Sequence, residues 1–106
     1  MFYALKNLKK RSPGAGVEMQ AIHGDRMTLV FFLLQTDGII PEHRHPHEQM
    51  GTVLSGTIEL TISGRRRTLS KGDAWHIPSD AIHSGRCLEG PAEVVEIFSP
   101  VREDFK

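Results

Sequence analysis

The sequence predicts an all-β protein, built as a small antiparallel β-barrel or jelly roll. Glycine, proline, aspartate and serine residues that favour turns recur at short intervals, so no stretch between them suits a long helix. Between the turns apolar and polar residues alternate, as at Ile58, Leu60 and Ile62, which is the period of a strand with one buried face. Many short strands at regular spacing are typical of a β-sandwich or barrel.

Each expected strand lies between turn signals, which are Gly24-Asp25, Asp37-Gly38, Ser55-Gly56, Ser63-Gly64, Gly72-Asp73, Pro78-Ser79-Asp80 and Gly90-Pro91. We therefore expect strands at residues 17–23, 27–35, 39–45, 50–54, 57–63, 66–70, 74–77, 82–86 and 92–99. Within one domain, 1–106, residues 1–15 are expected to form an N-terminal arm at a dimer contact, and residues 100–106 a C-terminal tail. Residues 27–34 are almost wholly apolar, which predicts a central strand covered on both faces or contact with a second subunit.

Composition limits the classes of function. The chain has 106 residues, the size of one domain, with 13 Lys and Arg against 13 Asp and Glu. A chain without net charge has no general attraction for nucleic acid or anionic lipid, so neither is an expected partner. The longest apolar run, residues 29–34, is far shorter than the ~20 residues of a membrane helix. The lone cysteine, Cys87, closes no internal disulfide and the first residues lack a secretory signal, so we expect a cytoplasmic protein.

Five of the six histidines lie between positions 43 and 83. Residues i and i+2 of a strand face the same side, so His43 and His45 can direct two imidazoles at one point. His83, at the start of a later strand, can add a third imidazole, and Gln49 can add an amide oxygen. This set leaves open positions on a divalent metal, as a catalytic site requires. Histidines on one face of an exposed strand are also compatible with simple hydration.

Two segments resemble the motifs of the cupin superfamily. The segment Gly38-Ile-Ile-Pro-Glu-His-Arg-His-Pro-His-Glu-Gln49 resembles the first motif, and residues 72–83 resemble the second. The resemblance implies a small antiparallel barrel with His43, His45 and His83 as inward-facing metal ligands. Gln49 stands where glutamate is usual, and a neutral oxygen leaves the metal a stronger Lewis acid that is held less tightly. His47 and Glu48 are alternatives for this ligand, and Ni, Fe, Mn, Zn and Co all accept such a set.

The C-terminal residues narrow the resemblance from the cupin superfamily to one group of cupins. Residues 96–105, Glu-Ile-Phe-Ser-Pro-Val-Arg-Glu-Asp-Phe, are similar to the carboxyl terminus of the KdgF-like cupins of pectin degradation. That resemblance implies opening of 4,5-unsaturated monouronates to 5-keto-4-deoxyuronates, with Glu96 and Arg102 catalytic and with Phe98 and Arg102 binding substrate. Arginine suits a sugar carboxylate because its planar fork can bond both oxygens. An aspartate is usual at the position of Glu96, which is longer by one methylene. Each of these residues also has a plain structural interpretation. Glu96 can be a solvated strand residue, Phe98 a core aromatic, and Arg102 a surface charge in a fraying tail.

Several alternatives stay open at this point. If Ala74 and His76 face inward, His76 lines the pocket and binds substrate, while Trp75 packs in the core or at a subunit contact. A core or surface role for His76 is equally compatible with the sequence. The leading hypothesis is a metal-dependent enzyme acting on a small carboxylated sugar. The same barrel could hold a small ligand without turnover, or hold Fe(II) as a cupin dioxygenase. Small size and the apolar strand at 27–34 favour a homodimer.

Overall fold

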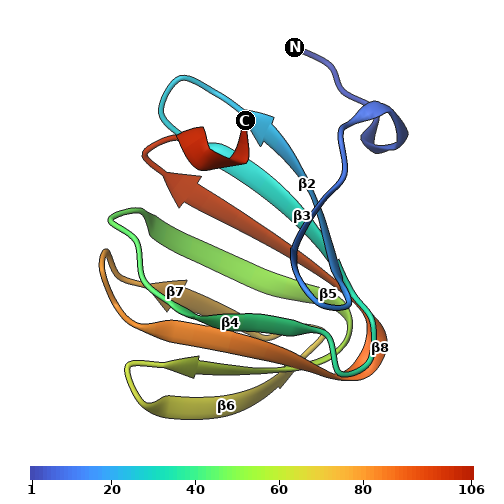
Figure 1. The fold of residues 1–106 in the computed structure, drawn as a ribbon, viewed down its shortest axis with the longest axis vertical. Helices are drawn as coiled ribbons and strands as arrows, with labels where there is room; N and C mark the ends of the chain where they lie inside the picture. The colour runs from blue at the N-terminus through green and yellow to red at the C-terminus, as the bar shows by residue number, and fades with distance from the viewer.

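The computed structural model describes residues 1–106 and is built almost entirely of antiparallel strands, which confirms the expected all-β class (Figure 1). The strands are β1 (Arg11–Gly14), β2 (Val17–His23), β3 (Thr28–Leu34), β4 (Ile39–His43), β5 (Glu48–Ile62), β6 (Arg65–Ser70), β7 (Ala74–Ile77) and β8 (His83–Ser99). The 3₁₀ helices η1 (Leu5–Asn7) and η2 (Glu103–Phe105) lie near the two ends of the chain. Neither helix is long or apolar enough to cross a membrane.

The strands form one sheet that is folded into two layers (Figure 1). The first half of β5 pairs with the second half of β8, and the second half of β5 pairs with the first half of β8. One layer therefore has the order β1-β2-β3-β8-β5-β7, and the other has the order β4-β8-β5-β6. This is a jelly roll in which the sheet bends over its core without closing into a complete barrel.

Strands β5 and β8 are each one long bent strand, whereas the sequence predicts two strands in each place. The expected turns at Ser55-Gly56 and Gly90-Pro91 lie inside these strands. Register shifts between Val53 and Ile58 show that β5 bulges there instead of reversing. Gly56 has a φ of +79°, and a Cβ at Gly56 would lie 2.6 Å from Ala92 Cα. The glycine therefore permits a bend and a close approach of two strands, which the sequence pattern does not distinguish from a hairpin turn.

The hydrophobic core lies between the two layers. Burial alternates along β3, because Thr28, Val30, Phe32 and Leu34 are buried while the residues between them are half-buried on the outer face. Within one chain the outer face of β3 is only half-buried, so full cover on both faces is not found, and the alternative of contact with a second subunit stays a prediction. The core cluster consists of Val17, Met19, Val30, Phe32, Leu34, Val53, Ile58, Leu69, Cys87, Ala92, Val94 and Phe98.

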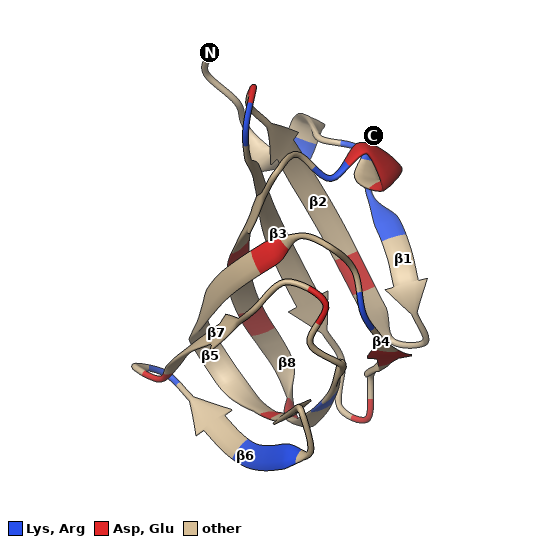
Figure 2. Cartoon of the chain, turned by 90° about the vertical axis from the view of Figure 1, so that its left-hand side faces the viewer, with Lys and Arg blue, Asp and Glu red and all other residues tan.

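Both ends of the chain are tied to the sheet. Part of the expected N-terminal arm forms β1, which pairs with β2. The C-terminal segment packs beside β1 (Figure 2). There Arg11 Nη1 donates to the carbonyl oxygen of Asp104 at 3.3 Å. Val101 and Arg102 are only 9% and 6% exposed. The end of the chain is therefore a fixed part of the molecule and not the fraying tail that the sequence alone allows.

Candidate metal centre and substrate cavity

Three histidines come together where β4 ends and β8 begins. His43 and His83 face each other across the two strands, with ring centroids 4.2 Å apart. The ring centroid of His45 lies 5.4 Å from that of His43 and 5.0 Å from that of His83. One ring nitrogen of each histidine lies within 4.8 Å of the other two. The strand ends at His43, two residues earlier than expected, but the chain beyond it still brings His45 to the same point.

Backbone carbonyl groups fix the orientation of two of these rings. His43 Nδ1 lies 2.7 Å from the carbonyl oxygen of Pro41, and His83 Nδ1 lies 2.8 Å from that of Ala81. A carbonyl oxygen only accepts hydrogen bonds, so each Nδ1 carries a proton, and Nε2 is the ring nitrogen left to bind a metal. A hydrogen bond of this kind orients the imidazole ligands of most protein metal sites.

The third ring, that of His45, is held neutral by its surroundings. Burial, followed by the charges of Arg102 and the neighbouring histidines, lowers the pKa of His45 to about 4. Burial also lowers the pKa of His83. Neutral imidazoles are the form that binds a metal. Both ring nitrogens of His45 are buried without a hydrogen-bond partner. Buried polar atoms are normally paired, so one of these unpaired nitrogens fits a cation bound among the three rings.

Hydrogen bonds connect the two segments that supply the histidines. The backbone N–H of Asp80 donates to the carbonyl oxygen of His45 at 2.8 Å, and Ser79 Oγ donates to that of Pro46 at 2.6 Å. Asp80 has a φ of 62°, a left-handed conformation that aspartate tolerates in turns. The turn before β8 therefore holds the loop after β4 in place, and the relative positions of His45 and His83 are fixed.

Gln49, Glu96 and Trp75 form a hydrogen-bonded group that includes part of the cavity wall. Gln49 Nε2 donates to Glu96 Oε2 at 2.5 Å, and Trp75 Nε1 donates to the same oxygen at 2.8 Å. Gln49 Oε1 is buried without a partner. Burial raises the pKa of Glu96, although both hydrogen bonds and Arg102 oppose the rise. A carboxyl group with a raised pKa is suited to proton transfer near neutral pH.

A cavity of about 300 Å³ lies next to the histidines. Its polar wall includes His43, Gln49, His83, Glu96 and Arg102, and its apolar wall includes Phe32, Ile40, Leu60, Ile77 and Phe98. Phe98 is 2% exposed, and its ring centroid lies 5.8 Å from that of His45. A small, partly open cavity with apolar walls and a few convergent polar groups is typical of a small-molecule site.

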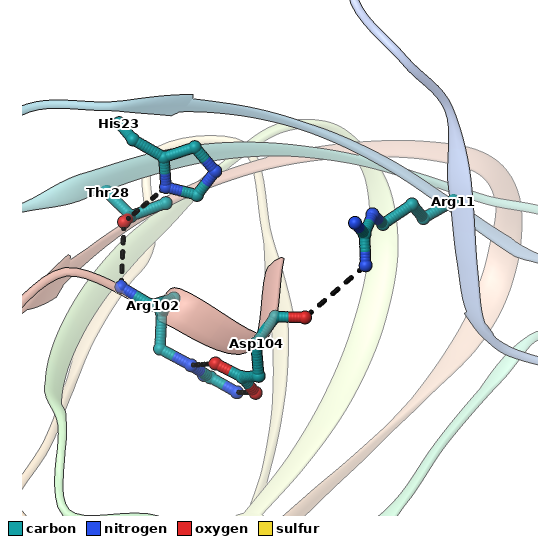
Figure 3. A network of polar contacts seen from close by, with 5 residues as sticks. All are labelled: Arg11, His23, Thr28, Arg102 and Asp104. Carbon is teal, nitrogen blue, oxygen red and sulfur yellow. Dashed lines mark hydrogen bonds and ion pairs between the residues drawn. The ribbon is translucent and has the colours of Figure 1, made fainter. Parts of the chain in front are cut away.

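Arg102 lies in the cavity wall and is held from several sides. Its side chain is 7% exposed, and its Cζ lies 4.8 Å and 3.9 Å from the ring centroids of Phe98 and Phe105. Arg102 Nε and Nη2 donate to the carboxylate of Asp104 at 3.0 Å and 2.8 Å, and this ion pair lowers the pKa of Asp104. The backbone N–H of Arg102 donates to Thr28 Oγ1 at 2.9 Å (Figure 3).

The structure places His76 away from this cavity. His76 is opposite Met50 on the outer face of the sheet, and its Nε2 lies 2.8 Å from Glu48 Oε2. The expectation that Ala74 and His76 face inward is wrong, because Trp75 takes the inward position. Trp75 lies on the same face of β7 as Ile77, which is 1% exposed, and the space above Gly51 accommodates the indole. Glu48, an alternative ligand, is therefore engaged on the outer face.

The remaining alternative ligand, His47, lies beside the histidine site. Its ring centroid is 5.4 Å from that of His45, and its Nδ1 is buried without a partner. It does not belong to the cluster of three ring nitrogens formed by His43, His45 and His83. The structure thus brings together the three predicted histidine ligands, Gln49, Glu96, Phe98 and Arg102, and it separates His76 from them.

Sequence reasoning missed Trp75, Asp104, Phe105 and Thr28 as neighbours of the site. An acidic residue two positions after Arg102 is a usable signal for the Asp104 ion pair. The contact of Trp75 with Glu96 has no such signal, because it is made across three strands.

Comparison with known proteins identifies the family. A family model described as a cupin domain matches residues 30–98. The pectin degradation protein KdgF of Dickeya dadantii is 31% identical over 94 residues, which cover 87% of this chain and 86% of that protein. The structure of KdgF from Halomonas sp. superposes with a TM-score of 0.91 at 27% identity, covering 100% and 98% of the two chains. An RmlC-like cupin from Shewanella frigidimarina shares the fold, with a TM-score of 0.91, 24% identity and 99% and 95% coverage. The chain therefore belongs to the cupin family, and KdgF is among its homologues.

Proposed function

We propose that this chain is a metal-dependent enzyme that opens 4,5-unsaturated monouronates, sugars of pectin or alginate breakdown, to linear 5-keto-4-deoxyuronates. One observation carries the proposal: a cavity of about 300 Å³ is lined by histidines of the candidate metal site, by Glu96 and by Arg102. Its size suits a single sugar better than a polymer. Homology to KdgF supports a substrate derived from pectin.

His43, His45 and His83 would hold a divalent transition metal, with Gln49 Oε1 as the fourth ligand. The free ring nitrogens and the unpartnered amide oxygen are the donors that Ni, Fe, Mn, Zn and Co accept. When bound, such an ion supplies a Lewis acid that polarises the oxygens of the substrate. Because Gln49 is neutral where a glutamate is usual in cupins, its oxygen offsets none of the ion's charge.

Arg102 is proposed to bind the carboxylate of the sugar. A guanidinium group has five N–H donors and can bind a carboxylate along more than one edge. Asp104 engages the edge formed by Nε and Nη2, which leaves the edge formed by Nη1 and Nη2 for a second carboxylate. In this arrangement Asp104 holds the arginine in position without occupying the whole fork, and Phe98 provides an apolar wall beside it.

The proposed reaction is an isomerisation, so its atoms balance without added water. The hydroxyl group on C1 loses a proton, the bond between C1 and the ring oxygen breaks, and an aldehyde forms at C1. The enolate left at C5 becomes a ketone when C4 receives a proton. Glu96 is the carboxyl group in the cavity wall and its pKa is raised, so it is the proposed acid and base for these transfers.

The reaction can be tested directly. The purified, metal-loaded protein is mixed with an unsaturated monouronate, and the loss of absorbance from the conjugated double bond is followed over time. The proposal predicts conversion faster than in buffer and formation of the linear keto sugar. Binding of the sugar without conversion would identify a sugar-binding cupin instead, and oxygen uptake would identify a dioxygenase.

We further propose that the protein acts in the cytoplasm as a homodimer. The outer face of β3 and β8 carries Leu29, Phe31 and Leu33, half-buried, next to Ile97, which is 39% exposed. Met50 of β5 lies beside Ile97 and is 52% exposed. An apolar patch of this kind is typical of a homodimer interface, and Glu18 and Glu93, which pair with Leu33 on its two sides, border it. The single cysteine, Cys87, is buried and free, which suits a reducing compartment.

A further inference from the structure

We propose that Trp75 and Gly51 act as positioning residues that set the orientation of the Gln49 amide through Glu96. The consequence is that Gln49 presents its oxygen, and not its nitrogen, to the metal. The inference rests on the metal site of the proposed function. Trp75 and Gly51 are assigned to the metal site although neither binds the metal, because both act through Glu96.

Trp75, Gly51 and Glu96 occupy one row across three neighbouring strands. Gly51 of β5 is paired with Trp75 of β7 on one side and with Glu96 of β8 on the other. Side chains two strands apart start about 9.5 Å from each other, twice the spacing of adjacent strands, and are normally separated by the side chain between them. Gly51 has no side chain, and Trp75 Nε1 reaches Glu96 Oε2 at 2.8 Å across it.

The space above Gly51 is filled by its two neighbours. A Cβ at Gly51 would lie 2.5 Å from Trp75 Cζ2 and 2.7 Å from Glu96 Cγ. Gly51 is not among the glycines with a positive φ, so its backbone conformation is open to other residues. The glycine is therefore required by the contact between Trp75 and Glu96 and not by the path of the chain.

This contact determines which end of the Gln49 amide faces Glu96. The indole N–H can only donate, so Glu96 Oε2 is an acceptor. The atom of Gln49 that shares this oxygen must also donate, which assigns Nε2 to Glu96 and turns Oε1 toward the other side. Oε1 is then left buried and unpartnered. An ionised carboxylate has no proton to donate from Oε2, so with Glu96 in that form the two contacts alone give the assignment.

The orientation matters because the two ends of an amide differ in what they can bind. The oxygen has lone pairs for a metal, whereas the NH₂ group is a donor only. An amide free to rotate would spend part of its time with the wrong end toward the ion. Loss of partners that orient a metal ligand typically weakens metal binding by about 10- to 100-fold.

Cobalt(II) titration of the metal-free protein tests the inference without substrate. Affinity is measured by calorimetry, and the visible spectrum of bound cobalt reports its coordination number. Two pairs of variants are compared. Glu96→Gln keeps an acceptor oxygen for the N–H donors of Gln49 and Trp75, and Glu96→Leu removes it. Both variants lack the carboxylate charge, so their comparison isolates the acceptor. Trp75→Phe removes the indole N–H, and its control, Thr52→Val, removes a hydrogen bond to Asp73 on the other face of β5.

We expect Glu96→Leu to bind cobalt about 10- to 100-fold more weakly than Glu96→Gln, with a spectrum of lower coordination number. We expect Trp75→Phe and Gly51→Ala to weaken binding, and Thr52→Val to match the wild type. Equal affinities and spectra for the two Glu96 variants, or wild-type binding by Trp75→Phe, would overturn the inference. A wild-type protein that binds cobalt but does not convert uronates would overturn the proposed reaction and leave the inference standing.

Discussion

At the scale of single residues, the proposed reaction depends most on Glu96. The Glu96→Gln change keeps an acceptor for Trp75 and Gln49 but removes the group that exchanges protons. We expect turnover of an unsaturated monouronate to fall about 10²- to 10⁴-fold, the usual contribution of general acid and base catalysis. Kinetics and elemental analysis of the same sample check this, and the metal content should not change. Turnover near the wild-type rate would exclude Glu96 as the acid and base.

The sequence predicts the three histidines because strand parity and the cupin-like motifs are local patterns. It leaves the roles of Trp75 and His76 open, although Trp75 shares its face of the strand with Ile77, and such an apolar pair indicates the buried face. Gly51 on the neighbouring strand leaves the space that the indole ring occupies. The sequence also does not predict the hydrogen-bond partners of Glu96, because Gln49 and Trp75 lie on other strands, β5 and β7.

At the scale of elements, η2 and the residues before it are held partly by the ion pair between Arg102 and Asp104. The folded pKa of Asp104 lies below its ordinary value of 3.8, so the pair stabilises the protein above that pH. This contribution is lost as the pH falls through the folded pKa. We expect Asp104→Asn to have a lower Tm than the wild type at neutral pH, and the difference to shrink below pH 3.8.

Thermal unfolding at the two pH values provides the check. Glu103→Gln is the matched control, because Glu103 is 75% exposed and pairs only with Lys106 on the surface. A Tm difference for Asp104→Asn that is the same at both pH values would contradict a role for its charge.

The bend of β5 toward β8 also contributes to stability at the scale of elements, and Gly56 lies at this bend. Gly56 and Gly64 have similar φ values, +79° and +81°, but only Gly56 has atoms of another strand where a Cβ would lie. Both Gly56→Ala and Gly64→Ala should lower the free energy of unfolding by about 1–2 kcal/mol, because alanine is strained in a left-handed conformation. We expect Gly56→Ala to be the less stable in urea unfolding, because it adds a clash with Ala92. Equal stabilities would show that the close approach at the bend is not tight.

The same bends explain which elements the sequence predicts correctly. Strands bounded by true chain reversals, such as β2 and β7, have the expected bounds. Strands β5 and β8 were each divided in two because a bulge and a turn use the same residue types. Whether the chain reverses or continues is decided by pairing between distant halves, which local composition does not contain.

At the scale of the whole molecule, the apolar outer face of β3, β8 and β5 is covered only in part within one chain, by the N-terminal segment that contains Leu5. We expect light scattering to give the mass of a dimer. Phe31→Glu places a charge in this face and should give a monomer, because an unpaired charge is costly to bury. Thr68→Glu on β6, which is exposed in the other layer, should leave the dimer intact. A monomeric wild type would refute the proposed interface.

The most direct test of the whole account is the metal content of the folded protein. The central claim is that the imidazoles of His43, His45 and His83 hold a divalent transition metal. Elemental analysis of protein purified without chelators, followed by titration of any metal-free fraction, should give one ion per chain. His45→Ala should remove this binding while the fold is retained. A folded wild-type protein that contains no such ion and takes up none on titration would contradict the account.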